Sequence, residues 1–110
     1  MPNGWDRNWV RFTLTVAGFR SKFGDWPTTV RLSPAILANV RDMFSPERFD
    51  ALERRIKLTA DDEIDPIAFF RAEDDDGHSY YYGGVEPGVD AEAARRWLGV
   101  SPDNPHGWSD

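Results

Sequence analysis

The chain has 110 residues, which is enough for a single domain with its own hydrophobic core. Apolar residues at 40% and charged residues at 29% exclude intrinsic disorder, and the lack of cysteine excludes disulfides, thiolate metal sites and cysteine nucleophiles. No apolar run approaches the roughly 20 residues that cross a bilayer, and the first residues lack the apolar segment of a secretion signal. We therefore expect no membrane partner and a cytoplasmic location.

The net charge of −6 is divided unevenly along the chain. Residues 1–41 contain six basic and two acidic residues, a net charge of +4, whereas residues 42–110 contain seven basic and 17 acidic residues, a net charge of −10. This asymmetry can place surfaces of opposite sign on one molecule and steer a charged partner. The simpler interpretation is that both sets of charges are solvated faces.

The first predicted element is a β-strand over residues 9–17. Its apolar residues alternate with arginine and threonine: Val10, Phe12, Leu14 and Val16. A period of two is typical of a strand with one buried face and one wet face. A second strand is predicted over residues 28–32, where β-branched residues follow Pro27. The residues between form either an irregular loop or a single helical turn at 19–23 that ends at Gly24.

Two short helices are predicted next, with the same start signal. Ser33 and Ser45 are each followed by proline, and serine is a favoured N-cap while proline fits the first helical position. Apolar residues recur at helical spacing over residues 34–44 and 46–55. A brief strand is predicted over residues 56–59.

A β-hairpin is predicted from residues 67–73 and 79–83. The connecting residues include Asp76 and Gly77. Asp-Gly between two strand patterns is among the strongest short hairpin signals, because both residues tolerate positive φ.

A last helix is predicted over residues 91–98, with Asp90 as its N-cap and Gly99 at its end. Residues 101–110 are rich in proline, glycine and asparagine, which predicts a flexible C-terminal tail after a single domain over residues 1–100. The fold class expected from these elements is α+β, a mostly antiparallel sheet of four or five strands with two or three helices packed on one face.

Aromatic and basic residues gather after the first predicted strand, and we call these five residues the basic-aromatic segment: Phe19, Arg20, Lys22, Phe23 and Trp26. Large aromatics in a predicted loop either cap the core or form a binding surface. Trp26 precedes Pro27 at the entry to a strand, which favours a core cap. Phe23 lies nearer the apex of the predicted loop, which favours a binding role.

Three consecutive tyrosines, Tyr80 to Tyr82, lie in the second strand of the predicted hairpin. Neighbouring residues of a strand face opposite sides, so either Tyr81 packs inward while Tyr80 and Tyr82 are exposed, or the reverse holds. With the aspartates at 74–76, these residues define an acidic tyrosine hairpin. Tyrosine is enriched at interfaces, so Tyr80 and Tyr82 are candidate partner-binding residues.

The acidic turn does not satisfy a known metal motif. If Gly77 is placed at the sixth position of a calcium loop, Ala72 and Gly83 fall on the first and twelfth positions and supply no ligand. A weaker site from Asp74, Asp76 and His78 would need a shared face, which a turn normally interrupts. We expect no bound metal and no cofactor.

Catalytic motifs are also absent from the sequence. His78 and His106 are the only histidines, one beside a turn and one in the predicted tail, and no serine lies in a nucleophile-elbow context. We expect a non-enzymatic protein-binding module, such as a small accessory, inhibitor or immunity-type protein. It would use the basic-aromatic segment, the acidic tyrosine hairpin or both.

Two alternatives remain open. The first is a single-stranded nucleic-acid binder that uses the basic-aromatic segment, because aromatics interleaved with arginine and lysine can stack on bases and contact phosphates. The acidic second half of the chain opposes this reading, because it would repel a polyanion. The second alternative is a small hydrolase of unknown substrate. The sequence does not indicate the oligomeric state.

Overall fold

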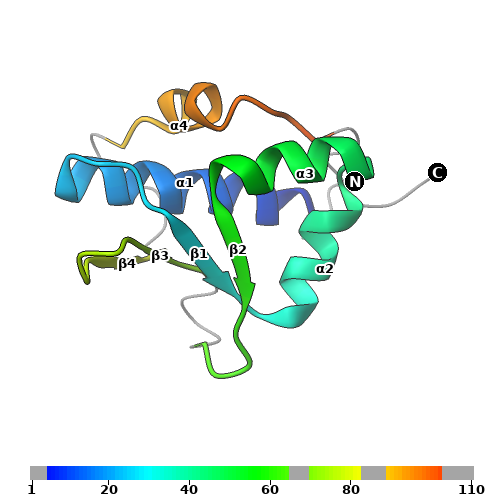
Figure 1. The fold of residues 1–110 in the computed structure, drawn as a ribbon, viewed down its shortest axis with the longest axis horizontal. Helices are drawn as coiled ribbons and strands as arrows, with labels where there is room; N and C mark the ends of the chain where they lie inside the picture. Colours follow the sequence, from blue (N-terminus) through cyan, green and yellow to red (C-terminus); the bar gives the residue numbers. More distant parts are fainter. Residues whose placement is uncertain (1–4, 65–69, 83–88, 103–110) are drawn as a thin grey trace.

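The computed structural model describes residues 5–64, 70–82 and 89–102. In this part of the chain there are four helices and four strands, shown in Figure 1. In chain order they are α1 (Trp5–Phe23), β1 (Thr29–Leu32), α2 (Pro34–Asp42), α3 (Pro46–Arg55), β2 (Lys57–Ala60), β3 (Phe70–Glu73), β4 (Ser79–Tyr81) and α4 (Ala91–Leu98). No helix among these is both long and apolar enough to span a membrane.

The α+β class is confirmed, but the sheet is mixed instead of mostly antiparallel. The strand order is β2-β1-β3-β4, with β1 and β2 parallel and the other neighbours antiparallel. The parallel pair arises because α2 and α3 connect β1 to β2, and a helical crossover brings the chain back in the same direction. The described residues also contain one helix more than the two or three expected.

The strand predicted over residues 9–17 is wrong, because these residues belong to α1. Trp9, Phe12, Val16 and Phe19 recur at helical spacing, and all four are buried on the face of α1 that packs on the core. Val10 lies off this stripe and is 51% exposed. The alternation that suggested a strand is therefore incidental.

Two threonines of α1 donate hydrogen bonds from their hydroxyl groups to carbonyl oxygens of the preceding turn of the helix. The hydroxyl of Thr13 donates to the carbonyl oxygen of Val10 at 2.8 Å, and that of Thr15 donates to Arg11 at 2.7 Å. Both threonines are fully buried, so these bonds to the preceding turn avoid unpaired hydroxyls in the core. Burial of the whole stripe outweighs the weak preference of β-branched residues for strands.

The predicted bounds of α3 and α4 and the predicted start of α2 are confirmed, whereas α2 ends at Asp42 instead of continuing to residue 44. The side chains of Ser33, Ser45 and Asp90 accept hydrogen bonds from backbone N–H groups in the first turns of α2, α3 and α4. Gly99 ends α4 with φ +74°, and Gly24 takes φ +85° just after α1, conformations that favour glycine. The brief strand predicted at 56–59 is also found, as β2.

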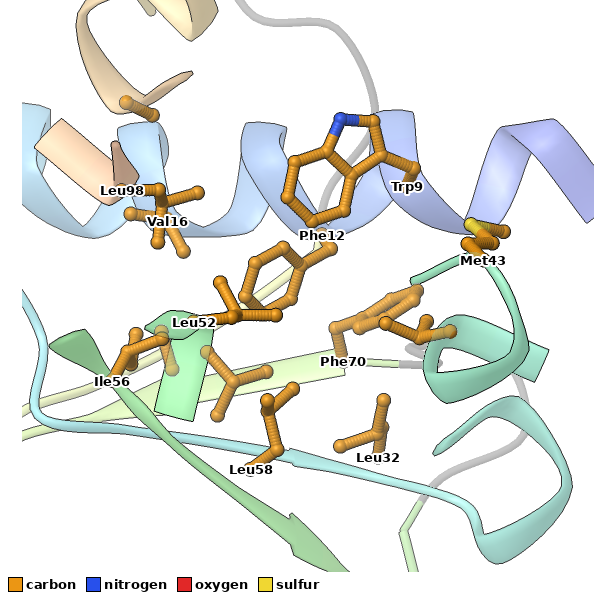
Figure 2. Close-up of a cluster of buried hydrophobic side chains, with 14 of the residues drawn as sticks. Trp9, Phe12, Val16, Leu32, Met43, Leu52, Ile56, Leu58, Phe70 and Leu98 are labelled. Carbon is orange, nitrogen blue, oxygen red and sulfur yellow. The ribbon is translucent and has the colours of Figure 1, made fainter. Parts of the chain in front are cut away.

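The core lies between one face of the sheet and α1. Val30, Leu32, Leu58, Phe70 and Ala72 point to this face from alternate strand positions and are buried. Figure 2 shows Phe12 extending from α1 toward the layer that contains these side chains. Helix α4 packs on α1 from the side away from the sheet, so α1 lies between them (Figure 1). The helices thus cover one face of the sheet.

The predicted hairpin is confirmed over the described residues. Strands β3 and β4 pair antiparallel, with Ala72 opposite Tyr80, and Gly77 takes φ +90° in the turn. Residues 67–69 and 83 of the predicted strands lie outside the described residues. So do residues 103–110 of the predicted tail, while the carbonyl oxygen of Ser101 accepts a hydrogen bond from Arg48 at 3.2 Å.

Candidate protein-interaction surface

The basic-aromatic segment lies mostly on a helix, not in a loop. Because α1 continues to Phe23, the chain presents Arg20 and Lys22 as exposed side chains in the last turn of the helix. Cations are favourable there because they face the negative end of the helix dipole. Phe19 is fully buried and contributes to the core, so it offers no surface to a partner in this conformation.

Trp26, which lies between α1 and β1, forms a column of aromatic and cationic groups with residues from three helices. Its ring stacks on Trp97 of α4, with centroids 4.7 Å apart and an interplanar angle of 7°. The guanidinium of Arg20 lies 5.0 Å from the centre of Trp26, and that of Arg55 lies 5.4 Å from the centre of Trp97. We call these four residues the arginine–tryptophan stack. Both rings are half-buried against the core, while both arginines are exposed.

The stack includes two residues that sequence reasoning did not select, Arg55 and Trp97. The sequence placed Trp97 beside the apolar stripe of the last predicted helix, but it did not indicate that Trp97 contacts Trp26. Residues 26 and 97 are distant in sequence, and only the packing of α4 on α1 brings them together. Stacked aromatics and cation–π contacts of this kind each contribute about 0.5–1.5 kcal/mol.

A hollow of about 300 Å³ lies beside Trp26, between α1 and the start of α4. Its lining includes the exposed Arg20, the hydroxyl-bearing Ser21 and the carboxylate of Asp90. Such a mixture of an aromatic ring with a few polar groups can accept one side chain of a partner. Its volume lies at the lower limit of the range of about 300–1,000 Å³ that is typical of small-ligand cavities.

The acidic tyrosine hairpin adjoins the basic-aromatic segment. The ring of Phe23 packs against His78 with centroids 4.5 Å apart, while the ammonium of Lys22 lies 5.4 Å from the centre of Phe23. The two regions that the sequence offered as alternatives therefore form one continuous surface. It spans the end of α1 and the turn between β3 and β4.

Of the two arrangements considered from the sequence, the three tyrosines follow the one in which Tyr80 and Tyr82 face the core and Tyr81 faces outward. Tyr80 and Tyr82 are half-buried and pack against the core, whereas Tyr81 is 46% exposed on the other face of the sheet. Tyr80 lies directly on Gly18 of α1, where a side chain as small as a methyl group would overlap its ring. Gly18 is therefore required for close approach of the hairpin to the helix.

Replacing Gly18 by Ala should destabilise the protein by about 1 kcal/mol, because the Tyr80 ring must move away from α1. At a site without this contact, the same change in a helix stabilises by about 1 kcal/mol. The sign should therefore reverse when Gly18→Ala is made in a Tyr80→Ala background. Urea denaturation of the four proteins measures both effects, and stabilisation in both backgrounds would show that Tyr80 does not rest on Gly18.

The acidic turn brings three possible ligand atoms together. One ligand atom each from Asp74, Asp76 and His78 lies within 4.8 Å of the others, although the turn was expected to separate these side chains. Asp74 causes this arrangement, because its carboxylate accepts backbone hydrogen bonds from residues 76 and 78 and contacts the Nδ1 atom of His78 at 2.9 Å. Burial alone would raise the pKa of Asp74, but these hydrogen bonds and His78 lower it overall.

This cluster has too few ligands for a dedicated cation site. Calcium takes about six to eight oxygens and structural zinc about four ligands. Both oxygens of Asp74 are already engaged inside the turn. The arrangement is explained by turn chemistry, in which aspartate bonds to backbone groups two residues ahead.

The face of the sheet away from α1 carries a charged network. The Nε atom of Arg31 donates to Glu73 at 2.9 Å, and the guanidinium of Arg71 donates to the other carboxylate oxygen of Glu73 through two nitrogens. Arg71 also donates to the hydroxyl of Tyr81 at 3.1 Å. Sequence reasoning did not select these residues, although strand alternation places Arg31 and Arg71 opposite the buried residues.

The network shifts the pKa values of its members in the expected directions. Burial by itself would raise the pKa of Glu73, but hydrogen bonds from Arg31 and Arg71 lower it below the ordinary value of 4.5. The pKa of Arg71 is raised, first by its hydrogen bond to Tyr81 and then by that to Glu73. Glu73 is therefore ionised in the folded protein at neutral pH.

The pH dependence of stability should reveal how much the ionised carboxylate of Glu73 stabilises the fold. Its pKa is lower in the folded state than in the unfolded state, so its stabilising effect is present above pH 4.5 and is lost as the pH falls through the lowered value. We expect Glu73→Gln to be less stable than the parent at pH 7, with the difference narrowing as the pH is lowered below 4.5. Urea melts over a series of pH values test this, with Glu53→Gln on the exposed side of α3 as the control. A difference that grows as the pH falls below 4.5 would contradict the expected titration.

A second hollow, of about 460 Å³, lies at the corner between α2 and α3. Its lining combines Arg41 and Phe49 with the acids Asp42, Asp50 and Glu53. The guanidinium of Arg41 lies 5.2 Å from the centre of Phe49. The described lining includes no serine, threonine or histidine, so it offers neither a hydroxyl nucleophile nor an imidazole base.

Comparison with protein-family models, with curated proteins and with solved structures found no match for this chain. The class of the site must therefore be argued from its geometry. That geometry is a surface of exposed cations and half-buried aromatics packed against the core. Aromatic residues and arginine are enriched at protein interfaces, so this surface is the candidate site.

Proposed function

We propose that this chain is a non-enzymatic protein-binding module whose contact surface is centred on the arginine–tryptophan stack. The observation that carries the proposal is the column itself, in which two tryptophans stack in parallel and an exposed arginine lies over each ring. Tryptophan and arginine are the residues most enriched among those that dominate protein–protein binding energy. Preordered side chains also lower the entropy lost on association.

The single-stranded nucleic-acid alternative has less support from the packing. A base needs an open aromatic face on which to stack. Trp97 stacks on Trp26, and the guanidinium of Arg20 lies 5.0 Å from the centre of the same ring, so a base would have to displace these groups. Phe23 is likewise in contact with Phe19 and His78. The acidic turn at 74–76 also lies beside Phe23 and would repel phosphates.

The hydrolase alternative has the least support. His78 is held by Asp74 in an exposed turn and lines neither of the two hollows described above. A general base must lie within hydrogen-bond reach of a substrate held in place. The cytoplasm remains the proposed location.

Replacing Arg20 by Ala should weaken partner binding by about tenfold or more, because it removes an exposed hot-spot cation that contributes little to the core. The melting temperature should fall by only a few degrees, because the cation–π contact with Trp26 contributes about 0.5–1 kcal/mol. The matched control is Arg54→Ala, which removes an exposed arginine of α3 that is not part of the stack. Affinity purification with quantitative mass spectrometry compares the tagged parent and the two variants.

A protein retained by the parent and by Arg54→Ala but depleted with Arg20→Ala supports the proposal. Fluorescence anisotropy with a single-stranded oligonucleotide provides the opposing test. Salt-sensitive oligonucleotide binding that is lost in Arg20→Ala, without any depleted protein, would favour the nucleic-acid alternative instead. Equal protein recovery from all three baits would remove the stack as the binding surface.

A further inference from the structure

We propose that the hollow beside Trp26 receives a tyrosine side chain of the partner protein, whose ring lies against Trp26 and whose hydroxyl bonds to Arg20 and Asp90. This inference rests on the function proposed above, because it names the residue type that the contact surface recognises. The hollow has a volume of about 300 Å³ and lies between α1 and the start of α4. It is lined by Ala17, Arg20, Ser21, Trp26, Asp90 and Ala93.

The lining carries two opposite charges that do not pair with each other. The guanidinium carbon of Arg20 lies 5.0 Å from the centre of the Trp26 ring. The Oδ1 atom of Asp90 accepts a hydrogen bond from the backbone N–H of Ala93 at 3.1 Å. Among the described residues, neither Arg20 nor Asp90 has an ion-pair partner, although both line the same hollow. A ligand in the hollow therefore meets a cationic donor and an anionic acceptor.

This arrangement of charges disfavours a charged occupant. A carboxylate from a partner would bind Arg20 but would be repelled by Asp90, and a cationic side chain would bind Asp90 but would be repelled by Arg20. A wholly apolar side chain is also unfavourable, because it would remove water from both charges without replacing their hydrogen bonds. The best occupant is therefore neutral and carries both a hydrogen-bond donor and an acceptor.

The apolar part of the lining favours an aromatic ring for the rest of the occupant. Trp26 is half-buried and offers an aromatic neighbour, and Ala17 and Ala93 present only methyl groups. Aromatic rings pack well on one another in offset or edge-on arrangements. The occupant thus combines a flat apolar body with a polar tip.

Tyrosine is the aromatic residue whose polar group matches both walls. Phenylalanine has no polar group, and the indole of tryptophan donates one hydrogen bond but accepts none. A neutral histidine has a donor and an acceptor, but the carboxylate of Asp90 favours its protonated form, which Arg20 repels. A tyrosine hydroxyl can donate to the second oxygen of Asp90 while it accepts from Arg20. Tyrosine is also enriched among the residues that dominate protein–protein binding energy.

The probe is N-acetyl-tyrosinamide, which carries no charge at neutral pH. Its controls are N-acetyl-phenylalaninamide, which lacks the hydroxyl, and the O-methyl ether of the probe, which keeps the acceptor but lacks the donor. Binding to the full chain is followed by amide chemical-shift changes. We expect saturable changes at Ser21, Asp90 and Ala93 with the tyrosine probe. The two controls should bind about tenfold more weakly, the effect of one charge-assisted hydrogen bond.

Three variants locate the binding to the hollow. Asp90→Asn keeps the N-cap of α4, since asparagine caps helices as well as aspartate, but an amide nitrogen replaces the second carboxylate oxygen. The preference for the tyrosine probe over the phenylalanine probe should then fall by about tenfold. Ala93→Leu keeps a good helix former but fills the hollow, so the chemical-shift changes should disappear. Asp25→Asn removes an exposed carboxylate next to Trp26 that does not line the hollow, and should bind like the parent.

Equal binding of the tyrosine and phenylalanine probes to the parent would overturn the inference. So would an unchanged preference in Asp90→Asn, or a lack of saturable changes in the hollow. None of these results depends on the affinity purification with Arg20→Ala, which tests the proposed function. A protein depleted with Arg20→Ala would keep the arginine–tryptophan stack as the contact surface even if the hollow shows no preference for tyrosine.

Discussion

Replacing Phe12 by Ala should lower the free energy of unfolding by about 3–5 kcal/mol, the usual cost of removing a fully buried phenylalanine. Phe12 has no exposed surface and stacks on Trp9 with centroids 5.3 Å apart. It lies at the centre of the contact between α1 and the sheet in Figure 2. Urea denaturation followed by tryptophan fluorescence and by circular dichroism measures the loss. A change below about 1 kcal/mol would be incompatible with this position in the core.

The control for this prediction is a matched pair of valines in α1. Val16 is fully buried and Val10 is half-exposed, although a strand would place both on one face. We expect Val16→Ala to cost about 2 kcal/mol and Val10→Ala to stay within about 0.5 kcal/mol of the parent. Similar losses from the two variants would support a strand over residues 9–17 and contradict the helix.

Replacing Trp26 by Ala should cost about 2–3 kcal/mol, somewhat less than a fully buried tryptophan, because its ring is half-exposed. The loss combines packing against the core with the stacking on Trp97. This is the outcome expected of a core cap at the entry to β1. Thermal and urea melts measure it directly.

A double-mutant cycle separates the free energy of stacking between the two rings from that of packing against the core. Trp26→Ala, Trp97→Ala and the double variant should show a coupling free energy of about 1 kcal/mol, as measured for aromatic pairs. Arg96→Ala in α4 serves as the control, because it is exposed and its side chain pairs with Glu92 instead of the stack. Strict additivity of the two tryptophan variants would show that their rings do not interact in solution.

The candidate site was predicted in part. Arg20, Lys22 and Trp26 were selected from the sequence because aromatics rarely gather among cations without a structural or functional reason. Their partners Arg55 and Trp97 were missed, since no local pattern connects residues so far apart. Phe19 was selected with them but is buried, because the segment is helical and the helix turns this residue toward the sheet.

Local chemistry alone determined most of the element boundaries from β1 onward. Ser33, Ser45 and Asp90 cap helices because their side chains bond to nearby backbone N–H groups, an interaction that needs no distant residue. Gly77 and Gly99 adopt positive φ for the same local reason, since glycine has no Cβ to clash.

Only the tertiary structure determined that α1 is a helix and that the sheet is mixed. It also determined how the arginine–tryptophan stack and the network of Arg31, Arg71 and Glu73 form. In α1 a period of two and a period of 3.6 are both present, and the helix forms because it buries Trp9, Phe12, Val16 and Phe19 on one side. The parallel pairing of β1 with β2 and the meeting of Arg31, Arg71 and Glu73 depend on which strands become neighbours. That choice is made by long-range packing, whose free energy exceeds the weak local preferences of the strands.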